Sequence, residues 1–292
     1  MLTFSLTMPQ PIRRAAVAGT WYSGRPEVLA KDIDQCLDQV RHVVDGDMVG
    51  LVVPHAGLIY SGHVAAHAYR AVAGRAYDVV VLVGPSHYVG FEGVAIERSG
   101  SFETPLGRVA ISEVDAEAIV TASTAVHERP AAHAREHSLE MQLPFVQRVL
   151  PETPIVPLVM GHQTPATISR LADAMVEALS TRRALLVASS DLSHFHRALQ
   201  AATLDAVVID AINRFDPEAL ARALGKFPDH ACGGGPIVTV MLAARGLGAA
   251  DARVMKYADS GDVSGDKSSV VGYLAAVLGT LSASSGEEAV PQ

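Results

Sequence analysis

The sequence predicts a three-layer α/β/α fold with a mainly parallel central sheet. One observation is a set of short apolar runs bounded by Gly, Pro or Ser, which is typical of strands buried on both faces. The other is that stretches with helical periodicity separate these runs, as in proteins that alternate strands and helices. The runs lie at residues 50–54, 78–84, 155–160 and 184–189.

The remaining elements follow from hydrophobic spacing. An amphipathic helix is expected over residues 26–44, because Leu29, Ile33, Leu37 and Val40 recur at helical intervals. In the first half of the chain we also expect a helix at 61–72, a hairpin at 93–111, a helix at 113–122 and a loop that turns helical near Ser138. In the second half we expect a helix at 166–180, two helices within 198–224, a helix from near Pro236 and strands at 253–260 and 268–277.

The alternation favours a single domain over residues 11–281, since no linker-like break or internal repeat interrupts it. Residues 1–10 are expected to form a flexible leader, and the small, polar residues 282–292 a disordered tail. The longest apolar run, at 270–281, is about half of the ~20 residues needed to span a bilayer. We therefore expect a buried strand there and no membrane segment.

Composition excludes several classes of partner. The formal net charge is −8 and the chain has no run of Lys or Arg, which argues against binding to nucleic acid or an anionic membrane. Two cysteines far apart in sequence, Cys36 and Cys232, do not indicate a disulfide framework. A reducing, cytoplasmic setting is expected. Arg13 and Arg14 follow the apolar N-terminal stretch, which is the wrong order for a signal peptide.

Three histidines follow apolar runs directly. They are His55 in PHAGLIYSG, His87 in GPSHYVG and His194 in SSDLSHFH. In an open α/β sheet the ligand crevice lies outside the carboxyl ends of the strands, so the three imidazoles are predicted to share one site. Histidine serves there as a metal ligand or as a general base.

Other residues extend the predicted site. Cys232 precedes three glycines and Pro236, and a helix start favours a thiolate that ligates metal or attacks as a nucleophile. A small residue in a crowded turn is the structural alternative. Asp191 lies three residues before His194 and is expected to orient its ring, although His196 could face the cleft instead.

His137 and Glu140 are spaced i, i+3, which places them on one face of a predicted helix. They could be a ligand pair, the wall or second shell of the cleft, or a solvated helix start capped by Ser138; the wall or second shell is favoured. The segment from Gly261 has the wrong spacing for a phosphate loop, and Asp262 would repel phosphate. No nucleophile elbow of a serine hydrolase is present in the sequence.

Eight motifs follow one another along the chain. They are GTWYSG, PHAGLIYSG, GPSHYVG, ETPLG, EHSLEMQLPF, SSDLSHF, ACGGGPI and YADSGDVSGDKSSVVGYLA. In order and spacing these motifs resemble the Memo family, whose microbial members are called AmmeMemoRadiSam system protein B, and the resemblance covers about residues 11–280.

The resemblance implies a fold similar to that of the class III extradiol (LigB-type) dioxygenases, which are non-heme Fe(II) enzymes. It implies that His55 and His87 bind metal and that His194 is the acid/base histidine. Cys232 takes the place of a carboxylate ligand, which counts against ring cleavage. Iron (Fe²⁺) is the expected metal, while a soft thiolate also suits copper or zinc.

Three functions follow from this resemblance. One is a metalloenzyme with redox or oxygenase-like chemistry on an unknown small substrate. Another is a binding module that recognises a peptide, a radical-SAM protein or an AMMECR-type partner in the same pocket. The third is a zinc hydrolase with His194 as base. Trp21 and Tyr60 are expected to line the pocket, with Asp262 nearby. Exposed apolar helix faces favour a homodimer.

Overall fold

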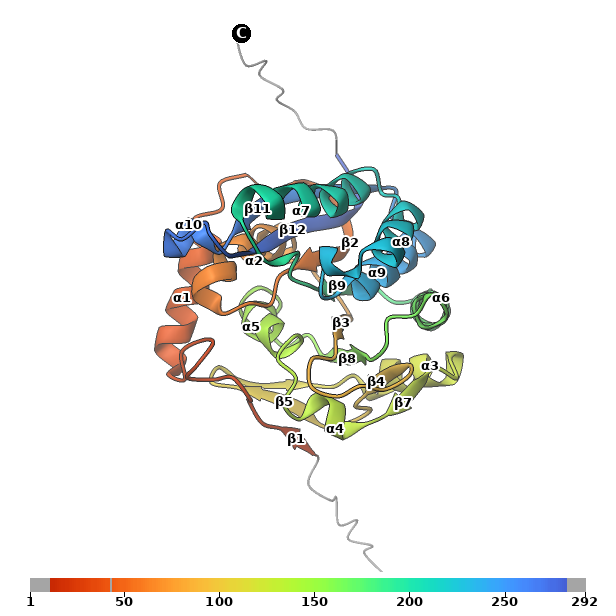
Figure 1. Cartoon of the computed structure of the whole chain (residues 1–292). Helices are drawn as coiled ribbons and strands as arrows, with labels where there is room; N and C mark the ends of the chain where they lie inside the picture. Colours follow the sequence, from red (N-terminus) through yellow and green to blue (C-terminus); the bar gives the residue numbers. More distant parts are fainter. Residues whose placement is uncertain (1–10, 43, 283–292) are drawn as a thin grey trace, which may run out of the picture.

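A computed structural model describes residues 11–42 and 44–282. The expected leader and all of the expected tail except Ser282 lie outside the described residues. Helices flank both faces of a nine-stranded sheet (Figure 1), which confirms the three-layer α/β/α prediction. Within the described part of the chain, no helix is both long and apolar enough to cross a membrane.

Four parallel strands form the centre of the sheet. In spatial order they are β2 (Gly46–Val53), β9 (Ala184–Ser189), β3 (Val79–Pro85) and β8 (Ile155–Met160). Every residue of β3, β8 and β9 is buried, as expected for strands covered on both faces. The apolar runs of the sequence therefore predicted the centre of the fold correctly.

The flanking strands are mostly antiparallel. β12 (Val270–Leu281) pairs antiparallel with β2, β10 (His194–His196) and β11 (Asp251–Asp259). On the other side, β4 (Val94–Ile96) pairs antiparallel with β8 and parallel with β7 (Val126–Glu128). β7 and β10 were not predicted, because three residues are too few to show a hydrophobic period.

The predicted hairpin at 93–111 is only partly right. β5 (Ser101–Thr104) and β6 (Gly107–Ala110) do form a hairpin, and β1 (Ile12–Arg13) adds a third strand to that small sheet. β4 instead joins the main sheet. The apolar β4 is buried there, whereas three of the four residues of β6 are exposed.

Two groups of helices cover the sheet. On one face α2 (Leu58–Val72) packs on β2 and β12, with α1 (Pro26–Asp38) and α5 (Leu143–Val149) beside it. On the other face α9 (Gly234–Gly246) packs on β2, β3 and β9 and contacts α6 (Pro165–Leu179) and α8 (Pro217–Lys226). The remaining helical segments are α3 (Glu113–Ala122) on α6, α7 (Ala198–Asn213) on β11 and β12, α4 (Pro130–His133), α10 (Gly261–Ser264), η1 (Glu140–Gln142) and η2 (Pro228–His230).

The helix predicted to start near Ser138 starts later. Residues 140–142 form a 3₁₀ turn and α5 begins only at Leu143. The Glu136 carboxylate accepts the N–H groups of His137 and Ser138, and the Ser138 hydroxyl donates to Pro85 O. These side-chain contacts fix an irregular backbone where the periodicity alone indicated a helix.

The strand register brings several loops to one edge of the sheet. Val53 pairs with Ser189, and Val83 pairs with Ala188, so β2, β3 and β9 end side by side. The segments that follow these strands carry His55, His87 and Asp191. The residue before α9 reaches the same edge, because the Gly233 N–H donates to Ser190 Oγ just after β9.

Candidate metal centre

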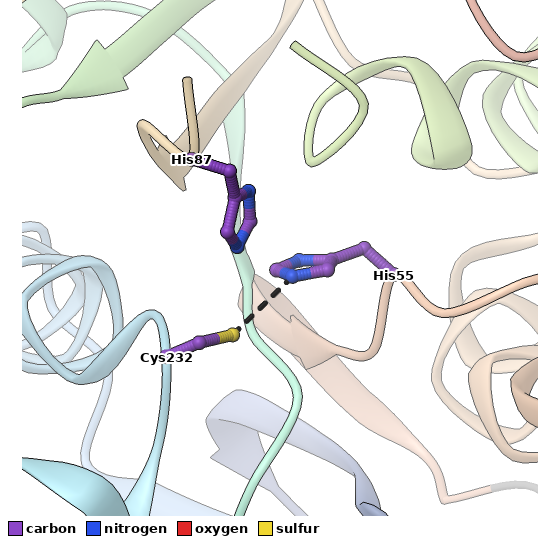
Figure 2. A group of neighbouring side chains, drawn as sticks. All are labelled: His55, His87 and Cys232. Carbon is purple, nitrogen blue, oxygen red and sulfur yellow. Dashed lines mark hydrogen bonds between the residues drawn. The ribbon is translucent and has the colours of Figure 1, made fainter. Parts of the chain in front are cut away.

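His55, His87 and Cys232 converge at the carboxyl edge of the sheet (Figure 2). One ligand atom from each residue lies within 4.8 Å of the other two. His55 Nε2 is 3.3 Å from Cys232 Sγ, and the centroids of the two imidazole rings are 5.1 Å apart. Three chain segments far apart in sequence thus place two nitrogens and one sulfur around a common centre.

The ring of His55 is fixed by a serine. The Ser189 hydroxyl donates its proton to Ser138 O at 2.6 Å, so its oxygen must accept from His55 Nδ1, 2.9 Å away. This sets the tautomer with a proton on Nδ1 and leaves the Nε2 lone pair facing Cys232. Burial lowers the pKa of His55 to about 3, with a further contribution from His87, so the ring is neutral at pH 7.

The ring of His87 is fixed by a carboxylate. Glu136 Oε1 lies 2.8 Å from His87 Nδ1, and Glu136 Oε2 accepts the backbone N–H of the same residue at 2.6 Å. A carboxylate only accepts, so the proton is on Nδ1 and Nε2 is free. Burial alone would raise the pKa of Glu136, but the hydrogen bonds from His87 lower it to about 2.

Glu136 was not among the site residues predicted from the sequence. The residue lies within the motif EHSLEMQLPF, directly before His137, which was assigned. The signal that could have found it is its type: a carboxylate next to a cluster of histidines is the usual partner of a metal-binding imidazole.

Contrary to the expectation from its place before a helix, the pKa of the Cys232 thiol is not lowered. Burial and the nearby Asp191 carboxylate raise its pKa. The start of α9 does not offset this effect, so the thiol keeps its proton unless a cation replaces it. Its loop is held by Gln163, which donates to Cys232 O at 2.7 Å and accepts the Gly235 N–H at 2.6 Å.

The three residues fit a first-row transition metal. Ligand nitrogen and sulfur atoms at roughly 2.0–2.1 and 2.3 Å from a tetrahedral metal lie about 3.5 Å apart. The observed separation of 3.3 Å between His55 Nε2 and Cys232 Sγ is close to that value. Two imidazoles and a thiol are also the donor types that iron, copper and zinc accept.

His194 and Asp191 lie beside this centre. His194 is half-buried on β10, and its charge acts on the pKa values of Asp191 and His55. Burial raises the pKa of Asp191 to about 6. Its Oδ1 accepts the backbone N–H groups of His55 at 2.7 Å and Ala56 at 3.2 Å. Asp191 therefore positions the His55 loop, and its expected role in orienting His194 stays a prediction.

His137, rather than His194, is the third imidazole packed with His55 and His87. Its ring stacks on His87, with centroids 4.4 Å apart, and lies 4.2 Å from the indole of Trp21. The hydroxyl of Tyr88 is 3.3 Å from His137 Nδ1. Burial lowers the pKa of His137 to about 3, so this wall of the site is uncharged at neutral pH.

Glu140 does not share a helical face with His137, because His137 precedes the helical segment. Its carboxylate is fully buried and accepts from Arg13 and from the Tyr22 hydroxyl, and also from the N–H groups of Ala16 and Val17. These bonds attach the segment that carries Trp21. Glu140 thereby stabilises the chain segment that places Trp21 in the wall of the site.

Two further predicted residues lie outside the ligand group. Tyr60 is in the first turn of α2 and is 38% exposed. Asp262 accepts the N–H of Asp259 at 3.0 Å and pairs with Lys267, which closes the loop around α10. Among the hydrogen bonds of the described residues, none joins Tyr60 or Asp262 to the three ligand residues.

The fold and this site define a class: α/β proteins with a His, His, Cys group at the carboxyl edge of a mainly parallel sheet. A family model described as "Memo-like protein" matches residues 13–277. The chain belongs to the Memo family.

Curated relatives agree over nearly the whole chain. A MEMO1 family protein of Pyrobaculum aerophilum is 39% identical over 275 residues, covering 90% of this chain and 97% of that protein. MEMO1 family proteins of Methanobrevibacter smithii and of a Thermotoga species (strain RQ2) are 35% and 38% identical, each covering 91% of this chain and 99% of the relative.

Proposed function

We propose that this Memo-family protein binds one metal ion through His55, His87 and Cys232. The observation that carries the proposal is that both imidazoles have their Nδ1 protons engaged, by Ser189 and by Glu136, so that both Nε2 lone pairs are free. Fixed tautomers of this kind are typical of metal-binding histidines. Three protein ligands would leave a position open, as in catalytic rather than structural sites.

The proposed chemistry is redox or oxygenase-like. When bound, iron would supply electron exchange with oxygen or with a small organic substrate, and copper or zinc would suit the same thiolate ligand. His194 would hold or move a proton beside the open position. Asp191 would keep the His55 loop in place through its two backbone hydrogen bonds.

A binding role is the alternative, and the aromatic wall favours it. Trp21, His137 and Tyr88 form an uncharged surface beside the centre that could stack on a flat ligand or a peptide side chain. The partner would be a peptide, a radical-SAM protein or an AMMECR-type protein in a cytoplasmic setting. A binding module would keep its partner affinity after the metal is removed, whereas an enzyme would lose all turnover.

The experiment compares the metal content of three proteins purified without oxygen or added metal. The wild type should carry close to one equivalent of iron or copper, and the His55→Ala/Cys232→Ala double variant should carry almost none. A His63→Ala/Cys36→Ala variant is the matched control, because it removes the same residue types away from the site.

An empty wild-type site that also refuses added Fe(II), Cu(I) and Zn(II) would overturn the proposal. Equal metal content in the wild type and the His55→Ala/Cys232→Ala variant would show that the ligands are wrongly assigned. A metal-loaded wild type that consumes oxygen with catechol-like or thiol substrates would favour the enzyme over the binding module.

A further inference from the structure

A cavity of about 610 Å³ lies between α6, α8 and α9, and it reaches Cys232. The three helices lie together on one face of the sheet (Figure 1). The volume is in the range of small-molecule sites. Cys232 is the one residue of the metal group that also lines this cavity. The cavity and the metal centre are therefore neighbours that share the loop before α9.

The walls of the cavity are largely aliphatic. Its apolar residues come from all three helices and from the loop before α9, and they include Pro165, Ile168, Leu224, Val238 and Leu242. A cavity with such walls favours an apolar occupant, because water inside it would have few hydrogen-bond partners.

The polar side chains of the lining already have partners in the protein. Gln163 uses its amide oxygen on the Gly235 N–H and its amide nitrogen on Cys232 O. The other three are paired with one residue each: His162 with Glu92, Ser169 with Asp173, and Glu218 with Arg245. A charged ligand would have to displace one of these pairs.

The start of α9 also lacks free donors, although a helix N-terminus commonly binds anions. The Gly233 N–H donates to Ser190 Oγ at 2.9 Å, and the Gly234 N–H donates to Ala231 O at 3.3 Å. Gly235 donates to Gln163, and the next residue is Pro236, which has no N–H. A phosphate or carboxylate would find no backbone donor here.

We propose that this cavity binds the apolar body of an uncharged small molecule whose end lies at the metal centre. The proposal rests on the proposed function, because it names the class of ligand that the metal site serves. The lining has no spare donor for an anionic group, and a buried charge without partners is costly, so the part of the ligand inside the cavity is uncharged. Gly234 and Gly235 allow close packing in the cavity wall, because a Cβ on either would come within 2.8 Å of a neighbouring side chain.

The test is a calorimetric titration of the wild-type protein with octan-1-ol and with octanoate, which have the same chain length and differ in charge. A chelator is added after the metal content has been measured, so that no cation attracts the carboxylate. Octan-1-ol should bind, and the affinity for octanoate should be at least about tenfold lower. Ala221→Trp and Gly225→Trp should each abolish octan-1-ol binding, since both exposed positions line the cavity and a Cβ on Gly225 meets no neighbour. Arg222→Trp, on the same helix but not in the lining, should bind like the wild type.

Equal binding of octanoate and octan-1-ol would overturn the proposal, and so would unchanged octan-1-ol binding in both tryptophan variants of the lining. Metal content is measured on the same samples. If octan-1-ol fails to bind while the wild type holds metal, the cavity proposal fails and the metal centre stands. The wild type could also bind octan-1-ol without holding metal. If both lining variants then lose octan-1-ol binding, the cavity proposal survives as a ligand site without the metal.

Discussion

Glu136 holds His87 at two points: one carboxylate oxygen lies 2.8 Å from the ring Nδ1 and the other accepts the backbone N–H at 2.6 Å. One residue outside the group of His55, His87 and Cys232 thus sets the position and the tautomer of this imidazole. The Glu136 side chain is 1% exposed, so water does not compete for these bonds. The free nitrogen of His87 is thereby directed to the centre.

Replacing Glu136 should weaken metal binding without removing a ligand. Glu136→Gln loses one of the two acceptor oxygens and the charge that favours a basic imidazole, so metal affinity should fall about 10–100-fold. Competition with a chromophoric chelator measures this. Glu92→Gln is the matched control, because Glu92 contacts His162 Nδ1 at the same 2.8 Å on the exposed surface. Equal losses in both variants would contradict the assigned role.

The sequence predicted the core of this site better than its surroundings. His55 and His87 follow strands whose apolar runs are unambiguous, so their meeting at one edge follows from the parallel topology. The short strand that carries His194 and the irregular turn at Glu136 depend on contacts between distant residues. Hydrophobic periodicity carries no information on such contacts, so periodicity alone could not predict the partner of His87 or the packing of His137.

Removal of His194 should separate metal binding from proton transfer. His194 lies on β10 outside the ligand group, so His194→Ala should keep the metal content of the wild type. Cys232→Ser should lower metal affinity at least about tenfold, because a hydroxyl is a poorer ligand than a thiolate for these metals. Metal analysis after dialysis compares the two. Loss of metal in His194→Ala would mean that His194 is a ligand.

The Glu140 carboxylate should contribute strongly to stability. It is fully buried and pairs with Arg13, so Glu140→Gln leaves an uncompensated buried charge and should cost about 3–5 kcal/mol of unfolding free energy. The exposed pair of Glu103 with Arg14 gives the control, and Glu103→Gln should cost far less stability than Glu140→Gln. Urea denaturation measures both. Similar costs for the two variants would contradict this account.

The buried His133 should make the metal-free protein less stable in acid. Burial, with the neighbouring Arg13, lowers the pKa of His133 from 6.5 to about 4. The unfolded chain therefore binds the proton first, and the stability present above pH 6.5 is lost as the pH falls toward 4. The loss from this residue is about 3 kcal/mol.

His133→Leu should reduce the loss of unfolding free energy between pH 6.5 and 4, measured in the presence of a chelator, and should leave the part caused by His55 and His137, whose pKa values are lowered to about 3. Replacement of the exposed His127 by Leu is the control and should keep the wild-type profile. A His133→Leu protein with the full wild-type loss between pH 6.5 and 4 would show that other groups cause it.

X-ray absorption at the edge of the bound metal tests the central claim most directly. With His55, His87 and Cys232 as ligands, the spectrum should show one sulfur at about 2.3 Å and two imidazole nitrogens at about 2.0–2.1 Å. The sulfur scatterer should disappear in Cys232→Ser and persist in the Cys36→Ala control. A wild-type spectrum without sulfur, or with only one imidazole, would contradict the assignment of the centre.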